Sequence, residues 1–238
     1  MRSLIEPADA RDLLAAQAAG SARCVIFDPP YAVGTPVRGR EDGAAGSVFG
    51  PLSFLHRTMT LSARALMPGG ILIAFTDVRR MADTGYAATT AGLRLATRVA
   101  WVRTRPGTGG LLRSSWDPVM VFARGVPKAV DRAAFLNVII TEGDFGAEDF
   151  TDADLVRENF SGVDAPAVIE ADYERPRRHP YSKPPAVYEH ILRRVCRPHD
   201  LILDPFAGSG SSRTAAYNLG LDLVWRGADI DSAYAELP

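Results

Sequence analysis

The stretch Val-Ile-Phe-Asp-Pro-Pro-Tyr at residues 25–31 has the pattern of a short buried strand that ends in a rigid turn. Its first three residues are β-branched or aromatic, as in a parallel strand that is covered on both faces. Pro29 and Pro30 end the strand, because proline has no N–H for a sheet ladder and its ring fixes φ. We therefore expect Asp28 at the carboxyl end of a strand in an α/β sheet, where open sheets of this kind place their ligands.

The turn after this strand carries groups that suit a planar amino group. The Asp28 carboxylate and the Pro29 carbonyl are hydrogen-bond acceptors, and Tyr31 adds a flat aromatic face. The exocyclic NH2 of a nucleobase is one such planar amino group. On these residues alone, a strand-ending turn with a satisfied carboxylate is an equally good interpretation.

A second stretch, Leu-Ile-Leu-Asp-Pro-Phe-Ala-Gly-Ser-Gly at residues 201–210, again has a short apolar strand that ends in an aspartate. Gly208 and Gly210 let the backbone approach a ligand closely, and a helix from Ser211 onward would offer free N–H groups to a carboxylate. The spacing lacks the third glycine of the dinucleotide-binding fingerprint. The two stretches together favour a ligand site over a plain turn.

Together the two stretches resemble the S-adenosylmethionine-dependent DNA amino-methyltransferases, which make N6-methyladenine or N4-methylcytosine. In that family Asp-Pro-Pro-Tyr is the catalytic motif and Asp-Pro-Phe-x-Gly-x-Gly is the cofactor motif. The order found here, with the catalytic motif first, is similar to that of the permuted β group. His-Pro-Tyr-Ser-Lys-Pro at 179–184 resembles the motif before the cofactor strand, and Gly-Ala-Asp-Ile-Asp at 227–231 resembles the acidic end of the next strand.

The resemblance implies a Rossmann-like methyltransferase fold, an α/β domain over residues 1–238 with a doubly wound, mostly parallel sheet and one reversed strand. It implies S-adenosylmethionine as the cofactor, lying across the carboxyl ends of the strands. Lys183 would lie close to the methionine part of the cofactor. The turn under that part would be formed by Asp204, Phe206, Gly208 and Gly210.

Two further carboxylates are assigned to the cofactor by the same resemblance. Asp229 would accept hydrogen bonds from both ribose hydroxyls, and motif alignment alone favours it over Asp231. Asp9 aligns with a family carboxylate that contacts the cofactor adenine. The N-cap of a helix at 10–19 explains Asp9 equally well.

The resemblance also implies a mechanism for the catalytic motif, Asp28, Pro29, Pro30 and Tyr31. A base flipped out of the duplex would stack on Tyr31, a contact worth about 1–3 kcal/mol. Asp28 and the Pro29 carbonyl would accept the amino hydrogens and turn the nitrogen lone pair toward the sulfonium methyl, without a covalent intermediate. Adenine N6 is the favoured target. Cytosine N4, an amino group of RNA or protein, and a non-catalytic nucleic-acid-binding role remain alternatives.

Charge is unevenly distributed along the chain, although its net formal charge is only −1. The segment 141–172 holds ten acidic residues and one arginine, so it carries −9 and the rest of the chain carries +8. The family usually has its target-recognition region here, so we treat 141–178 as an acidic-then-basic variable insert whose role stays open. The +8 remainder can build a phosphate-binding face, for which the candidate residues are Arg38, Arg40, Arg103, Arg105 and Arg113.

Composition supports one sizeable α/β domain, since 238 residues with 47% apolar content can bury a large core. No membrane span or secretion signal is evident, so a cytoplasmic protein is expected. Cys24 and Cys196 are expected to be reduced core thiols, and the four histidines lack zinc-ligand spacing, so no metal is predicted. Double-stranded DNA is the expected partner. Single-stranded DNA, a partner subunit and a homodimer remain open.

Hydrophobic periodicity places the remaining elements. We expect helices at 10–19, 52–67 and 186–197, with Pro-Gly-Gly at 68–70 ending the second. Strands are expected at 71–75, 93–103 and 118–123, and the segment 135–140 is apolar enough for a strand or a short helix.

Overall fold

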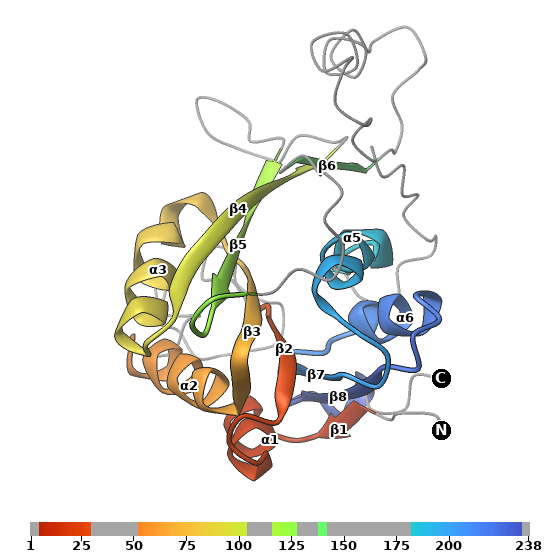
Figure 1. Ribbon diagram of the computed structural model, residues 1–238, viewed down its shortest axis with the longest axis horizontal. Helices are drawn as coiled ribbons and strands as arrows, with labels where there is room; N and C mark the ends of the chain where they lie inside the picture. Colours follow the sequence, from red (N-terminus) through yellow and green to blue (C-terminus); the bar gives the residue numbers. More distant parts are fainter. Residues whose placement is uncertain (1–4, 30–51, 104–115, 128–137, 142–181, 235–238) are drawn as a thin grey trace, which may run out of the picture.

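The structure is a computed structural model that describes residues 5–29, 52–103, 116–127, 138–141 and 182–234 (Figure 1). Several predicted site residues lie outside these ranges, and so does nearly all of the acidic segment 141–172. These residues are Pro30, Tyr31, Arg38, Arg40, Arg105 and Arg113.

The described elements follow the expected α/β order. The strands are β1 (Ile5–Pro7), β2 (Ala22–Phe27), β3 (Leu66–Phe75), β4 (Arg94–Arg103), β5 (Trp116–Ala123), β6 (Val138–Thr141), β7 (Leu201–Asp204) and β8 (Val224–Asp229). The helices are α1 (Ala10–Ala16), α2 (Leu52–Ala65), α3 (Met81–Thr90), α5 (Pro185–Val195) and α6 (Ser211–Asn218), with 3₁₀ turns η1 (Val78–Arg80) and η2 (Ser232–Tyr234).

The described strands form one sheet in the order β1-β8-β7-β2-β3-β5-β4-β6. All neighbouring pairs are parallel except the two that β5 makes with β3 and β4. The predicted fold class, a mostly parallel sheet with one reversed strand, is confirmed. Of the two alternatives for 135–140, the described part forms a strand, because β6 extends the sheet beside β4.

Helices cover both faces of the sheet, which makes the domain doubly wound. Figure 1 shows α1, α2 and α3 on one side and α5 and α6 on the other. Strand β2 is buried along its whole length. Its Val25 and Phe27 pack in a cluster with Leu55 of α2, whereas Cys24 and Ile26 pack in a cluster with Val187 of α5. The continuous apolar run of β2 therefore fills two cores at once.

The junction between α2 and β3 differs from the prediction. Helix α2 ends at Ala65, and the Pro-Gly-Gly sequence at 68–70 lies inside β3 rather than ending the helix. The register against β2 shifts there, because Ala22 pairs with Leu66 whereas Cys24 pairs with Ile71. A Cβ on Gly70 would lie 2.9 Å from the Met67 carbonyl oxygen, so this irregular strand needs glycine.

The two cysteines are free and buried, as predicted, and both belong to the same core cluster. Burial raises the pKa of the Cys196 thiol to about 12 and raises the pKa of the Cys24 thiol as well. The described helices include none that is long and apolar enough to cross a membrane. No cluster of three or more potential metal ligands occurs among the described side chains.

Candidate active site

The predicted aspartates come together because they follow three adjacent parallel strands. Leu203 of β7 pairs with Val25 of β2, and Asp204 pairs with Gly227 of β8. Asp28, Asp204 and Asp229 therefore stand at the carboxyl ends of neighbouring strands, at one edge of the sheet. Asp28 of the predicted catalytic motif and the predicted cofactor motif, which are far apart in the sequence, therefore meet at this edge.

Asp28 is held by a lysine from the other end of the chain. The Lys183 ammonium donates a hydrogen bond to Asp28 Oδ2 and forms an ion pair with it. Lys183 lies just before α5, and its Nζ also sits 4.8 Å from the centroid of the Phe75 ring. We predicted Lys183 beside the cofactor and not beside Asp28. The spacing of 155 residues between the two gave no signal of this contact.

Asp204 is buried and holds the glycine-rich turn in place. It accepts hydrogen bonds from the Ser212 hydroxyl and, over 3.1 Å, from the Phe206 backbone N–H. Trp225 Nε1 in turn donates to Ser212 Oγ at 3.1 Å. Burial raises the pKa of Asp204 to about 7, an effect that these two hydrogen bonds oppose and the nearby Asp28 carboxylate reinforces. The sequence offered no signal for the supporting Ser212–Trp225 contact.

The glycine-rich turn leaves room for a ligand. Gly210 has a φ of +79° and forms the N-cap of α6, with its N–H bonded to the Ala207 carbonyl at 2.8 Å. Gly208 has a φ of +48°, and a Cβ built on it would meet no atom within 4 Å. Ser209 between them hydrogen-bonds the Ser182 hydroxyl at 2.7 Å. An open backbone of this kind fits a ligand that lies against the turn.

Phe206 in the same turn packs into the core rather than standing free. Its ring makes edge-on contacts with Phe27 at 5.3 Å and with Phe54 of α2 at 6.3 Å, measured between ring centroids. These contacts fix the turn to β2 and α2, and so fix the predicted cofactor motif relative to the strand that precedes Asp28.

Asp229 reaches the turn from the end of β8. Its Oδ2 accepts the Gly208 N–H and its Oδ1 accepts the Asp231 N–H, each over 2.9 Å. Asp231 is exposed and caps η2 by accepting the Ala233 N–H at 3.0 Å. Asp229 is therefore the carboxylate that faces the glycine-rich turn. The next residue, Ile230, leaves 68% of its surface exposed, a feature that we did not single out from the sequence.

Asp9 has the capping role that we gave as the alternative. It is the N-cap of α1, and its carboxylate accepts hydrogen bonds from Arg11 N, Nε and Nη2 at 2.7–2.8 Å. The hydrogen bond from the Arg11 side chain lowers the pKa of Asp9. Capping accounts for this residue, and its contact with the cofactor adenine remains a prediction.

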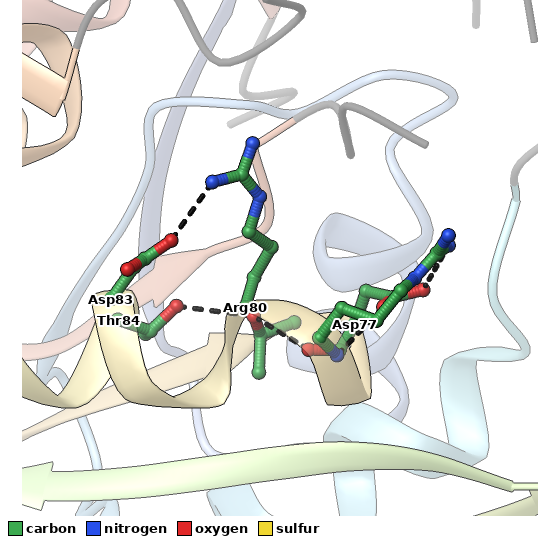
Figure 2. A network of polar contacts seen from close by, with 6 residues as sticks. Asp77, Arg80, Asp83 and Thr84 are labelled. Atoms are coloured by element: carbon green, nitrogen blue, oxygen red, sulfur yellow. Dashed lines mark hydrogen bonds and ion pairs between the residues drawn. The ribbon is translucent and has the colours of Figure 1, made fainter. Parts of the chain in front are cut away.

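A network of polar contacts follows β3, the strand beside β2 (Figure 2). The Thr76 and Thr84 hydroxyls lie 3.1 Å apart, and Arg80 forms an ion pair with Asp83 at 2.8 Å. Asp77 caps η1 by accepting a backbone N–H at 2.9 Å. The network fixes the connection from β3 into α3 at the sheet edge where Asp28 stands.

The family model and the two relatives that follow are all described as methylases or methyltransferases. A family model described as DNA methylase matches residues 22–237. The Type II methyltransferase M2.LlaDCHI of Lactococcus lactis subsp. cremoris is 22% identical over 226 residues, which cover 90% of this chain and 79% of that protein. The Type II methyltransferase M2.DpnII of Streptococcus pneumoniae is 22% identical over 191 residues, 77% of this chain and 64% of that protein.

Two solved structures share the fold. The M1.HpyAVI–SAM complex superposes with a TM-score of 0.62 at 18% sequence identity. The superposition covers 99% of this chain and 97% of the M1.HpyAVI chain. The cytosine-N4-specific PvuII DNA methyltransferase superposes with a TM-score of 0.68 at 16% sequence identity, over 96% of this chain and 82% of the PvuII methyltransferase chain.

Proposed function

The chain belongs to the DNA methylase family, and from this premise we propose that it transfers a methyl group from S-adenosylmethionine to the exocyclic amino group of a base in duplex DNA. The family modifies adenine N6 or cytosine N4. The observation that carries the proposal is the meeting of Asp28, Asp204 and Asp229 at the carboxyl ends of three adjacent strands. Adenine N6 is the target we expect first.

The glycine-rich turn and the end of β8 would hold the cofactor. Gly208 leaves open space beside the backbone, and Asp204 keeps the turn in shape from beneath. A carboxylate has about four lone-pair sites, so Asp229 can bind two hydroxyls as well as its two backbone N–H groups. The exposed Ile230 offers an apolar surface to the adenine ring. When bound, S-adenosylmethionine supplies the electrophilic methyl group.

The catalytic turn would act on the amino group of the base. Asp28 and the Pro29 carbonyl each accept one amino hydrogen, and Pro30 keeps that turn rigid. Tyr31 stacks on the flipped ring. With both hydrogens held, the nitrogen lone pair leaves conjugation with the ring and faces the methyl group. Most of the acceleration then comes from orientation, and Asp28 takes up a proton late in the step.

DNA would be held through its phosphates by the arginines that we identified in the sequence. Arg103 ends β4, which runs in the same direction as β3, so Arg103 lies at the sheet edge that carries Asp28. Arg105 and Arg113 follow in the segment between β4 and β5. With Arg38 and Arg40 from the segment after β2, they belong to the part of the chain that carries +8.

The proposal is tested by offering the purified protein four acceptors (duplex DNA, single-stranded DNA of the same sequence, RNA and protein) in separate reactions with labelled S-adenosylmethionine. Unmethylated duplex DNA should become labelled, whereas RNA and protein should not. Label in RNA or protein alone would overturn the proposed substrate class. If single-stranded DNA of the same sequence takes up as much label as duplex DNA, or more, the choice of duplex DNA as the substrate is wrong.

A further inference from the structure

The residues Ser182 and Lys183 connect the two motifs of the active site. Ser182 hydrogen-bonds Ser209 in the glycine-rich turn at 2.7 Å, and Lys183 binds Asp28 in the catalytic turn. Two consecutive residues therefore contact both the proposed cofactor turn and the proposed catalytic carboxylate.

The contact between Lys183 and Asp28 is shielded from solvent. The Lys183 side chain is 6% exposed and that of Asp28 is 16% exposed. A buried ammonium is costly unless it is paired, and removal of one partner of a buried pair leaves the other charge uncompensated. The face of the Phe75 ring, 4.8 Å from Nζ, adds a cation–π contact on the lysine. Lys183 is thus held in one place by a carboxylate and an aromatic ring.

From this geometry, and on the basis of the proposed function, we infer that Lys183 is a positioning residue for Asp28 in methyl transfer. A carboxylate that is bound at Oδ2 has its plane set, so the amino group of the base meets it in one orientation. A misplacement of about 1 Å in such an acceptor can cost about 100-fold in rate. This role differs from the predicted place of Lys183 beside the methionine part of the cofactor.

The test compares Lys183→Met, which keeps the apolar stem but removes the charge, with Lys183→Arg, which keeps the charge. Two quantities are measured for each: the dissociation constant of S-adenosylmethionine by calorimetry, and the single-turnover methylation rate at saturating cofactor and DNA. Lys183→Met should lower the rate by about 10- to 100-fold and leave the dissociation constant within about twofold of wild type. Lys183→Arg should recover part of the rate.

A matched control is Arg23→Met, which removes another buried cation at the opposite end of β2. Arg23 bonds the Gly69 carbonyl at 3.1 Å and lies near Asp200, so its loss should lower the melting temperature without changing the rate at saturation. If Lys183→Met does not fold, Lys183→Gln, which keeps a hydrogen-bond donor, is put through the same measurements.

Three results would overturn the inference. A weaker cofactor affinity with an unchanged rate at saturation would make Lys183 a cofactor ligand. An unchanged rate and affinity would give it no part in the reaction. A rate loss that Arg23→Met reproduces would make it structural. Failure of the proposed function is distinct from all three, since wild type itself would then transfer no methyl group.

Discussion

At the scale of single residues, Asp28 and Asp204, each followed by a proline, have different surroundings and hence different proposed roles. Asp28 is partly exposed and is paired with Lys183. Asp204 is buried, and its bonds go to Ser212 and to the turn that follows it. The Asp28 side chain, with 16% of its surface exposed, can still be reached by a reacting group, whereas the enclosed Asp204 side chain suits a structural support.

We predict that Asp28→Ala abolishes methyl transfer and leaves cofactor binding nearly intact, since the proposed role of Asp28 is to act on the amino group of the base. Calorimetry with S-adenosylmethionine and a methylation assay check the two halves. Asp28→Asn, which keeps the shape of the side chain, serves as the matched variant and should also be inactive. Loss of cofactor binding together with activity would show that Asp28 is structural.

The raised pKa of Asp204 predicts that the stability of the folded protein depends on pH. Its pKa is about 7 in the folded protein and near 3.8 when exposed, so its protonated form favours folding. The stability that it contributes is fully present below about pH 4 and is lost as the pH rises through about 7, at up to about 1.4 kcal/mol per pH unit.

Asp204→Asn cannot ionise, so the comparison isolates this group. Urea unfolding of the cofactor-free proteins should show the free energy of unfolding of wild type falling relative to that of Asp204→Asn between about pH 4 and pH 7. A difference between the two proteins that is constant over this range would contradict the assignment.

At the scale of elements, the strand ends and the turns that follow them form the site. The turn after β7 is tied to β8 through Gly208 and Asp229, and to the residues before α5 through Ser209 and Ser182. A change in one of these turns is therefore expected to act on cofactor binding more than on folding.

Gly208→Val should exclude the cofactor, because its side chain would enter the open space beside the turn. We expect the dissociation constant of S-adenosylmethionine to rise by roughly 100-fold or more, which corresponds to a loss of about 2.8 kcal/mol in binding free energy. Gly220→Val is the control, since Gly220 also has a positive φ (+63°) and open space but lies after α6.

Both variants carry the backbone strain of a side chain at positive φ, about 1–2 kcal/mol. They should therefore lose similar stability while only Gly208→Val loses cofactor affinity. Equal affinities in the two variants would remove Gly208 from the cofactor site.

Asp229→Ala should weaken cofactor binding by about 1–3 kcal/mol, the usual cost of leaving buried polar partners unsatisfied. It also frees the Gly208 N–H, so the turn itself loses a bond. Asp231→Ala should have the smaller effect, because Asp231 is exposed and caps η2. Calorimetry with S-adenosylmethionine on the two variants tests this prediction. A larger loss of cofactor affinity for Asp231→Ala would make Asp231, and not Asp229, the cofactor-binding carboxylate.

Most elements could be predicted because their cause is local. The apolar run of β2 and the periodic apolar positions of α5 identify their own structure. The prediction that Pro-Gly-Gly at 68–70 ends a helix is wrong, because the same residues suit a helix end and an irregular strand. Only the pairing of this segment with β2 distinguishes the two structures. The Lys183–Asp28 contact has no local signal at all, because it depends on how distant segments pack.

At the scale of the whole molecule, charge is separated along the chain. The segment 141–172 carries −9 and the remainder carries +8. An acidic segment repels DNA phosphates, so we propose that the arginines of the remainder bind DNA. This proposal requires that the segment 141–172, nearly all of which lies outside the described residues, takes no part in DNA binding.

Replacement of Arg103, Arg105 and Arg113 by glutamate should weaken DNA binding. It should also make the plot of log affinity against log salt concentration less steep, by roughly 0.9 in slope for each DNA phosphate that is no longer neutralised. Deletion of 141–172 should leave binding intact or strengthen it. Affinity measured at several salt concentrations tests both. Loss of DNA binding on deletion, in a protein shown to be folded, would instead make this segment the recognition region.

The most direct test of the central claim is nucleoside analysis of DNA that has been incubated with the protein and S-adenosylmethionine. The DNA is digested and its nucleosides are identified by mass spectrometry, with Asp28→Ala run in parallel. We predict N6-methyladenine from the wild-type protein and no methylated nucleoside from Asp28→Ala. A methyl group on a ring carbon rather than on an exocyclic nitrogen, or equal methylation by both proteins, would contradict the account.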